Sequence, residues 1–209
     1  SVMGALSGSG AGPAPGLGFV SRSARSAAQC RRINDRKIVG PAVTVMESAT
    51  DEMLPPQHAL DLIDESPAGS VICIAVAEEK NVAVWGGLMT AGAVANKHEA
   101  AILDGGVRDI VEIRRDYDFP VFARSASPGT TLGRYRTYAS NVPVRIGGVT
   151  VHPDDIVVGD IDGVVVVPRE HAEAVLAMSI EIDQRELEQA RLIIASGSLR
   201  EGLAKYGRI

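Results

Sequence analysis

Short apolar runs and stretches of helical periodicity alternate between residues 84 and 124. An apolar run ends at Trp85, and residues 88–98 then carry apolar side chains at the spacing of an amphipathic helix. The alternation continues with a strand over residues 100–103, a helix from Asp109 and a strand over residues 120–123. The pattern predicts a βαβαβ unit around which the rest of the chain is organised.

Glycine pairs come before both predicted helices. Gly86-Gly87 opens the first helix, and the expected turn Asp104-Gly105-Gly106 comes before the second. Because glycine has no Cβ, a ligand can approach the backbone closely there, and a helix N-terminus favours an anion. We expect Asp109 to cap the second helix, with Glu112 as its reciprocal partner. The pattern therefore predicts two anion sites at the ends of neighbouring strands.

The remaining pattern extends this unit in both directions within one domain over residues 1–209. The predicted elements are strands over 38–46 and 70–77, a helix over 56–64, a long loop over 124–141, an antiparallel β addition with strands over 142–146, 149–151, 156–158 and 164–167, a long helix over 168–195 and a tail helix ending the C-terminal segment 168–209.

Residues 1–37 form a Gly/Pro-rich and polar N-terminal arm that begins with a short helical pattern at residues 1–7. The basic stretch over residues 21–37 is interpreted as a solvated loop in preference to a clamp for an anionic substrate.

Composition narrows the classes of function. The chain has 209 residues, of which 45% are hydrophobic and 22% charged, so it can bury one sizeable core. Its net charge of -5 argues against direct nucleic-acid binding, which depends on clustered Lys and Arg. Cys30 and Cys73 are far apart, no secretory signal is recognised, and no apolar run reaches about 18 residues. We therefore expect a cytoplasmic protein without a membrane segment.

Several catalytic and metal-binding motifs are absent from the sequence. Its four histidines lack HExxH or paired-ligand spacing, and no CxxC occurs, so any metal should be bound by oxygen. The glycine pairs match neither GxGxxG nor GxxxxGK[ST], and there is no GxSxG elbow. Asp160 and Asp162 flank a predicted hairpin and are interpreted as turn residues in preference to metal ligands. Trp85 is expected in the core.

Arg108 and Asp109 are the charged residues at the start of the second predicted helix. Taken alone, Asp109 is an ordinary N-cap and Arg108 a surface ion-pair residue. Together they also fit a ligand site, because Arg can hold a carboxylate through two parallel hydrogen bonds and Asp offers a hard oxygen to Mg²⁺. The backbone amides of the first predicted helix, around Gly87, Leu88 and Met89, would hold a second carboxylate. This combination outlines a site for a 2-oxo acid.

Three segments of the chain resemble the RraA-like family. They are GPAVTV at residues 40–45, the stretch over residues 85–131 that contains DGGVRD at residues 104–109, and the stretch over residues 147–168 that ends in GDIDGVVVVP. The resemblance covers residues 38–209 and is weaker over residues 1–37. The family includes class II pyruvate aldolases acting on 4-hydroxy-4-methyl-2-oxoglutarate or 4-carboxy-4-hydroxy-2-oxoadipate, and the RraA regulators of ribonuclease E.

The resemblance implies an α/β fold, a swivelling β/β/α domain with mixed sheets and a long C-terminal helix, assembled into homotrimers or homohexamers with sites at subunit boundaries. It implies that Asp109 is the direct ligand of Mg²⁺ or Mn²⁺, and that Arg108 binds the pyruvyl group of a 2-oxo acid and stabilises its enolate. The amides of Leu88 and Met89 would hold the substrate carboxylate. Glu188 is the candidate for an acidic residue contributed by a neighbouring subunit.

Gly87 departs from the aldolase pattern. The aldolases have an acidic residue there, which acts on the substrate proton through water, whereas the RraA regulators have glycine. Two functions therefore stay open: a metal-dependent lyase that releases pyruvate by retro-aldol cleavage or oxaloacetate decarboxylation, and a non-catalytic regulator of a ribonuclease E-like partner. We favour the lyase because Arg108 and Asp109 are present, and because decarboxylation of oxaloacetate requires no base for a hydroxyl.

Overall fold

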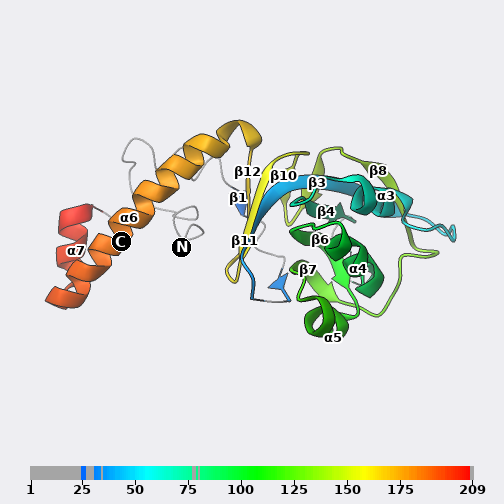
Figure 1. The fold of residues 1–209 in the computed structure, drawn as a ribbon, viewed down its shortest axis with the longest axis horizontal. Helices are drawn as coiled ribbons and strands as arrows, with labels where there is room; N and C mark the ends of the chain where they lie inside the picture. Colours follow the sequence, from blue (N-terminus) through cyan, green and yellow to red (C-terminus); the bar gives the residue numbers. More distant parts are fainter. Residues whose placement is uncertain (1–24, 27–30, 34, 77–78, 80, 208–209) are drawn as a thin grey trace. The chain divides into compact units, whose positions relative to one another are not determined.

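The computed structural model describes residues 25–26, 31–33, 35–76, 79 and 81–207 (Figure 1). The helical pattern at residues 1–7 and the Gly/Pro-rich segment after it lie outside this range. The chain divides into two compact units, and each is considered by itself. The first unit is residues 25–169, and the described part of the second is residues 170–207.

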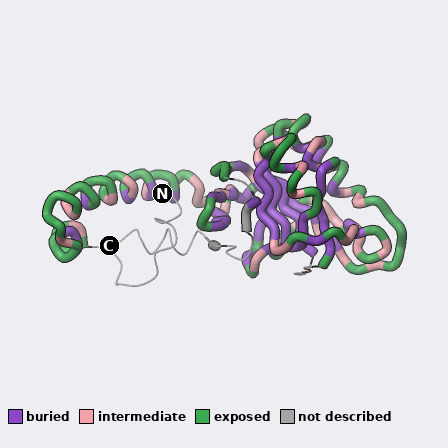
Figure 2. The backbone as a smooth tube through the Cα atoms, turned by 90° about the horizontal axis from the view of Figure 1, so that it is seen from below, coloured by how far each residue is buried: buried purple, intermediate pink, exposed green. Residues whose placement is uncertain are grey.

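A parallel sheet forms the centre of the first unit (Figure 1). Its four neighbouring strands are, in spatial order, β3 (Ile38–Ala49), β4 (Val71–Ala75), β6 (Ala100–Val107) and β7 (Val121–Ala126). Every residue of β4 and β6 is buried, as Figure 2 shows, because parallel strands are covered on both faces. The predicted strands over 38–46, 70–77, 100–103 and 120–123 are confirmed.

Helices cover one face of this sheet. α3 (Gln57–Glu65) connects β3 to β4, and α4 (Gly87–Ala95) connects the short strand β5 (Ala83–Trp85) to β6. Ile63 of α3 and Ala93 of α4 pack in one hydrophobic cluster with Ile72 and Ile74 of β4. Both helices confirm the predicted ones, and α3 buries only its inward face.

A β hairpin covers the opposite face. It consists of β9 (Val144–Ile146) and β10 (Val149–Val151), whose alternate residues are buried. They join a second hydrophobic cluster with Val71 and Cys73 of β4. These two residues alternate along β4 with Ile72 and Ile74, which face the helices, because successive side chains of a strand point to opposite faces. The unit therefore has two β layers and one α layer, the predicted α/β architecture with mixed strands.

Antiparallel strands extend the central sheet along β3. β11 (Ile156–Asp160) pairs with the first part of β3 and with β12 (Gly163–Val167), whereas β8 (Tyr135–Ser140) pairs with the last part of β3. The four predicted antiparallel strands over 142–167 are confirmed as β9 to β12, and β11 and β12 belong to the main sheet. The predicted loop over 124–141 is wrong, because it contains the end of β7 and all of β8. The sequence YRTYAS of β8 is largely polar because the strand buries only Thr137.

The structure tests the predictions for two polar segments next to the sheet, residues 21–37 and the turn that contains Asp160 and Asp162. The segment predicted as a solvated loop contains the two-residue strands β1 (Arg25–Ser26) and β2 (Arg31–Arg32), which pair with β12 and β7. At the turn between β11 and β12, the Asp162 N–H donates to the Asp160 carboxylate at 2.9 Å. The interpretation of these two aspartates as turn residues is confirmed.

Gly105 and Gly106 lie inside β6 and do not form the predicted turn. A Cβ on Gly105 would lie 2.7 Å from Cγ1 of Val76, and a Cβ on Gly106 would lie 2.8 Å from the carbonyl oxygen of Val82. The pairing of β6 with β7 also shifts register between Leu103 and Gly106. These glycines therefore allow close packing within the core, and no anion site is present at them.

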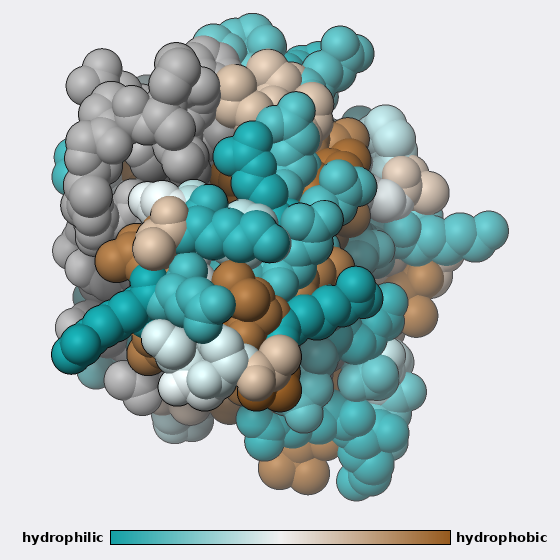
Figure 3. All heavy atoms as spheres, turned by 90° about the vertical axis from the view of Figure 1, so that its left-hand side faces the viewer, coloured by the Kyte–Doolittle hydropathy of each residue, from teal (hydrophilic) through white to brown (hydrophobic). Residues whose placement is uncertain are grey.

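The second unit is helical. A short 3₁₀ turn (Arg169–His171) leads into α6 (Ala172–Ser196), and α7 (Leu199–Tyr206) follows, so the predicted long helix and tail helix are confirmed. The hydroxyl of Ser198 caps α7 by accepting from the Glu201 N–H at 3.2 Å. Apolar side chains are exposed on both helices and lie among polar ones on the surface in Figure 3. Within the described ranges, no helix is both long and apolar enough to cross a membrane.

Candidate active site

The site forms where β5 and β6 end side by side. The two strands run parallel with Trp85 opposite Val107, and the Arg108 N–H donates to the Trp85 carbonyl at 3.0 Å. The chain that leaves β5 begins α4, and the chain that leaves β6 carries Arg108 and Asp109. Residues that are distant in sequence therefore meet at the carboxyl edge of the sheet, where ligands of open α/β sheets bind.

Gly86 and Gly87 give this edge a surface without side chains, which we call the glycine shelf. A Cβ on Gly86 would lie 2.8 Å from Oδ2 of Asp109 and 2.9 Å from Nε of Arg108. A Cβ on Gly87 would lie 2.7 Å from Oε1 of Glu112. Gly86 has an extended backbone that any residue can adopt, with φ of -162°. Glycine is therefore required for space, because three polar side chains lie against the shelf.

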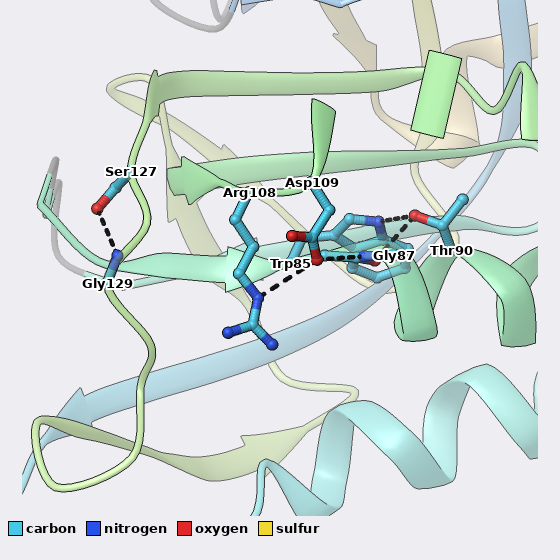
Figure 4. A network of polar contacts seen from close by, with 8 residues as sticks. Trp85, Gly87, Thr90, Arg108, Asp109, Ser127 and Gly129 are labelled. Carbon is cyan, nitrogen blue, oxygen red and sulfur yellow. Dashed lines mark hydrogen bonds and ion pairs between the residues drawn. The ribbon is translucent and has the colours of Figure 1, made fainter. Parts of the chain in front are cut away.

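Asp109 bonds to the shelf and does not cap its own helix. Its Oδ2 accepts from the Gly87 N–H at 3.0 Å, and no side-chain cap bond forms in α5 (Ile110–Glu112) (Figure 4). Its backbone is left-handed, with φ of 58° and ψ of 30°. The predicted capping box between Asp109 and Glu112 is therefore wrong, because this conformation turns the carboxylate towards α4. Such a conformation costs an L-residue about 1 kcal/mol, and an observed outlier of this kind supports a functional role.

Arg108 lies beside Asp109 and is open to ligands. Its Nε is 3.5 Å from Oδ2 of Asp109, and the Arg108 side chain is 44% exposed. Its two terminal nitrogens make no hydrogen bond within the described part of the chain. The guanidinium can therefore donate two parallel hydrogen bonds to a planar oxygen pair on a ligand.

Asp109 fits a hydrated divalent cation. Its Oδ1 has no hydrogen bond to a described residue, so one carboxylate oxygen is available as a hard ligand. No group of three or more His, Cys, Asp or Glu side chains that could hold a metal occurs in the described ranges. Mg²⁺ often keeps several waters and binds through one or two carboxylates together with substrate oxygens. The residues present fit such an ion with Asp109 as its protein ligand.

The N-terminus of α4 supplies the other predicted contacts. The Gly87 N–H already donates to Asp109, so Gly87 contributes its open surface. The next N–H groups belong to Leu88 and Met89, and a helix provides no internal acceptor for its first-turn amides. Leu88 is 87% exposed, whereas Met89 packs against the core. These two amides can receive a carboxylate at the positive end of the helix dipole.

Trp85 holds the shelf in place from below. It is 1% exposed, which confirms the expected core position, and its ring is stacked on Phe119 with centroids 6.1 Å apart. Its Nε1 donates to the Thr90 hydroxyl at 2.8 Å, and that hydroxyl donates to the Gly86 carbonyl at 3.0 Å. This chain of hydrogen bonds connects the Gly86 backbone to the buried Trp85 ring and so positions the glycine shelf relative to the core.

A serine in the segment predicted as a loop is hydrogen-bonded to the end of β6, next to Arg108 in sequence. Ser127 donates its hydroxyl proton to the Asn81 carbonyl at 2.7 Å and accepts from the Gly129 N–H at 3.2 Å (Figure 4). Its own N–H donates to the Val107 carbonyl at 3.0 Å. In the sequence, Ser127 is followed by Pro128 and Gly129, which indicate only a turn. The hydrogen-bond partners of Ser127 could not be predicted, because two of them, Asn81 and Val107, are distant in sequence.

Three buried ionisable side chains were not predicted from the sequence. Asp104 pairs with Arg124 at 2.7 Å, and both side chains are buried. Glu47 of β3 is 4% exposed, and neither of its carboxylate oxygens has a hydrogen-bond partner among the described residues. Burial raises the pKa of Glu47 from 4.5 to about 8. Glu47 directly follows the predicted strand over residues 38–46, and this position gives no indication of its burial.

Glu188 lies on α6 in the second unit. Its carboxylate accepts from the Tyr206 hydroxyl of α7 at 3.3 Å. The role of Glu188 in a neighbouring subunit stays a prediction.

The fold and the site define an α/β protein with an arginine–aspartate pair facing a helix N-terminus. The chain belongs to the RraA-like family, because the family model described as Aldolase/RraA matches residues 16–166.

Similar proteins agree with this assignment. Protein DlpA of Legionella pneumophila is 35% identical over 168 residues, which make up 79% of this chain and 27% of that protein. A Halalkalibacterium halodurans protein named "Putative 4-hydroxy-4-methyl-2-oxoglutarate aldolase" is 33% identical over 75% of this chain and 72% of its own length. The crystal structure of Streptomyces coelicolor RraAS2, described as an unusual member of the RNase ES inhibitor RraA protein family, shares the fold. It has a TM-score of 0.73 at 24% identity, covering 80% of this chain and 84% of that chain.

Proposed function

We propose that the protein is a divalent-metal-dependent lyase that releases pyruvate from 2-oxo acids. The reaction is retro-aldol cleavage of 4-hydroxy-2-oxo diacids, oxaloacetate decarboxylation, or both. The observation that carries this proposal is the placement of Arg108 and Asp109 against the glycine shelf, with open ligand-binding atoms on both. The relative named as an aldolase supports the same substrate class.

The substrate is oriented by two groups of donors. The N–H groups of Leu88 and Met89 receive the 1-carboxylate, and the Arg108 guanidinium donates to the 2-oxo oxygen. When the carbon–carbon bond breaks, negative charge develops on that oxygen. A fixed guanidinium stabilises this charged transition state more strongly than it stabilises the bound substrate. A divalent cation at Asp109, Mg²⁺ or Mn²⁺, would supply Lewis-acid stabilisation of the same charge. No lysine nucleophile is required.

Assembly into a homotrimer or homohexamer is part of this proposal. α6 exposes Leu176, Ile180, Leu187 and Ile194. Their spacings of four and seven residues place them on one face of the helix. An exposed apolar stripe of this kind is typical of an interface, and closed cyclic symmetry is the usual arrangement for identical chains. Glu188 on the same helix would then reach a neighbouring subunit's site.

The second candidate function is a non-catalytic regulator that binds a ribonuclease E-like protein. It is favoured by one feature, the absence of a side chain at Gly87, because the resembling aldolases have an acidic residue there. The open atoms of Arg108 and Asp109 favour the lyase, since a protein-binding surface alone does not require a left-handed aspartate beside a helix N-terminus.

The test is pyruvate release from a panel of 2-oxo acids with and without Mg²⁺. The panel contains oxaloacetate and 4-hydroxy-2-oxo diacids. Arg108→Lys should lower kcat/KM by about 10²-fold or more, because lysine lacks the planar fork that binds two oxygens. The matched control is Arg115→Lys, since Arg115 is an exposed arginine paired with Asp116 and should not affect catalysis. Absence of pyruvate from every substrate would favour the regulator.

A further inference from the structure

Glu112 is the carboxylate that lies against Gly87. The three heavy atoms nearest to a Cβ built on Gly87 are Oε1, Cδ and Oε2 of Glu112, at 2.7, 2.9 and 3.0 Å. Arg108 and Asp109 lie in the same way against Gly86, the neighbouring residue of the shelf. The three polar side chains therefore converge on two consecutive glycines.

The position of Glu112 follows from the backbone around Asp109. The left-handed residue Asp109 starts the three-residue helix α5, which ends at Glu112 and continues as a π-helix over Ile113–Tyr117. π-Helical segments occur frequently at functional sites. This path brings Glu112, three residues after Asp109, over the first turn of α4.

The Glu112 carboxylate is available for chemistry. It makes no hydrogen bond and no ion pair within the part of the chain that the structure describes. Asp109, in contrast, already accepts from the Gly87 N–H and offers its other oxygen to a cation. The positive end of α4 favours a negatively charged group beside Gly87. Of the two carboxylates at the shelf, Glu112 is the one free to exchange a proton.

We propose that Glu112 is the proton-handling carboxylate of retro-aldol cleavage, supplied from α5 across the position where Gly87 leaves room. This inference rests on the proposed lyase function. Glu112 takes the proton of the C4 hydroxyl, the C3–C4 bond breaks as the C4 carbonyl forms, and the electron pair passes to C3 and the 2-oxo oxygen as pyruvate enolate. The proton returned from Glu112 to C3 gives pyruvate, so the step balances without another reactant.

The same geometry explains the glycine at position 87. A side chain there would occupy the space of the Glu112 carboxylate. Gly87 does not have a positive φ, so the backbone conformation itself does not exclude other residues. The carboxylate is therefore present at the shelf, although residue 87 does not carry it.

The first experiment compares two reactions in Glu112→Gln, which preserves size and removes the base. Retro-aldol cleavage should fall by about 10²- to 10⁴-fold, the usual contribution of a positioned base. Oxaloacetate decarboxylation should fall much less, because this substrate has no hydroxyl proton to remove. Binding of oxalate, a mimic of the pyruvate enolate, should be unchanged by calorimetry in the presence of Mg²⁺. Asp116→Asn is the matched control in the same helical segment and should leave all three quantities at parent values.

The second experiment moves the carboxylate. Glu112→Ala should lose retro-aldol activity. Adding Gly87→Asp to this variant should raise the retro-aldol rate at least tenfold above that of Glu112→Ala. This expectation holds because the alanine vacates the space that a Cβ on residue 87 requires. A double variant that folds, binds oxalate and regains no cleavage would overturn the proposal.

The outcomes separate this inference from the proposed function. An equal loss of both reactions in Glu112→Gln, loss of oxalate binding, or no loss at all would overturn the role of Glu112 while the lyase function stands. A parent protein that decarboxylates oxaloacetate but cleaves no hydroxy acid would also overturn it. A parent protein that releases no pyruvate from any 2-oxo acid would refute the lyase function, and the inference falls with it.

Discussion

Strand β6 and the residues just after it contribute to two arginine–aspartate pairs, one buried and one exposed to solvent. Asp104, inside the strand, is 2.7 Å from Arg124 of β7, and these side chains are 1% and 3% exposed. Asp104 also accepts from the Gly147 N–H at 2.9 Å, which connects the hairpin β9–β10 to the sheet. Asp109, beyond the end of the strand, is 3.5 Å from Arg108, and both side chains are more than a third exposed. The first pair is surrounded by protein, whereas the second keeps ligand-binding atoms open, so burial separates a structural pair from the pair of the proposed site.

The largest expected effect is on stability, at the buried pair. Asp104→Asn keeps the shape of the side chain but removes the negative charge that faces the buried Arg124 guanidinium at 2.7 Å. The free energy of unfolding should fall by about 3–5 kcal/mol, the usual cost of breaking a buried ion pair. Urea denaturation measures this loss, and pyruvate release per folded molecule should stay close to the parent value.

The control for this prediction is Asp116→Asn. Asp116 also pairs with an arginine, Arg115, at 2.6 Å, but both side chains are exposed. Solvent screens such a pair, so its removal should leave the denaturation midpoint unchanged. Equal effects of the two substitutions would show that burial is not what distinguishes the pairs.

At the exposed pair the effect should be on activity. Asp109→Asn should lower metal-dependent pyruvate release by about 10²- to 10³-fold, because a neutral amide replaces the charged ligand of the proposed cation. Folding should be preserved, since asparagine tolerates the left-handed conformation and its amide oxygen can still accept from Gly87. A purified variant with the parent rate and the parent response to Mg²⁺ would show that the metal is not held here.

The same contrast explains what the sequence could predict. The apolar runs determine the parallel strands, and the residues that follow their ends, Arg108 and Asp109, could be selected because ligands bind at that edge. The partner of Asp104 could not be selected, because it depends on how β6 and β7 pair across a register shift. The contact of Glu112 with Gly87 depends on the left-handed backbone of Asp109, which the ordinary helix-capping pattern does not indicate.

The two glycine pairs show the same limit of prediction. They look equivalent in sequence, but Gly86-Gly87 lies below polar side chains at the site, whereas Gly105-Gly106 lies inside a buried strand. In both cases the space for a Cβ is occupied. The occupying atoms differ: they belong to the polar side chains of the site in one pair, and mainly to core side chains and backbone in the other. That difference depends on tertiary packing and is not encoded in either dipeptide.

Alanine substitutions sharpen this second comparison. Gly105→Ala places a methyl group 2.7 Å from Cγ1 of Val76 in a packed core, so it should lower the free energy of unfolding by about 1–3 kcal/mol. Gly86→Ala meets the partly exposed side chains of Arg108 and Asp109 instead of core atoms, so it should affect stability less and pyruvate release more. Thermal denaturation and the pyruvate assay, run on both variants, measure the two effects. Loss of stability in Gly86→Ala as large as in Gly105→Ala would contradict the difference.

Glu47 extends the comparison to a buried carboxyl without an arginine. Burial raises its pKa from 4.5 to about 8, so between these values the folded protein holds a proton that the unfolded chain has released. The stability that depends on this proton is fully present below pH 4.5 and is lost as the pH rises towards about 8. The expected slope is a fall in the free energy of unfolding of at most about 1.4 kcal/mol per pH unit.

Urea denaturation at pH 5.5 to 8.5 measures this slope. Glu47→Gln stays neutral and should flatten it. Glu52→Gln removes an exposed carboxylate and should keep the parent slope. Parallel curves for the parent and Glu47→Gln would mean that Glu47 is ionised in the folded protein.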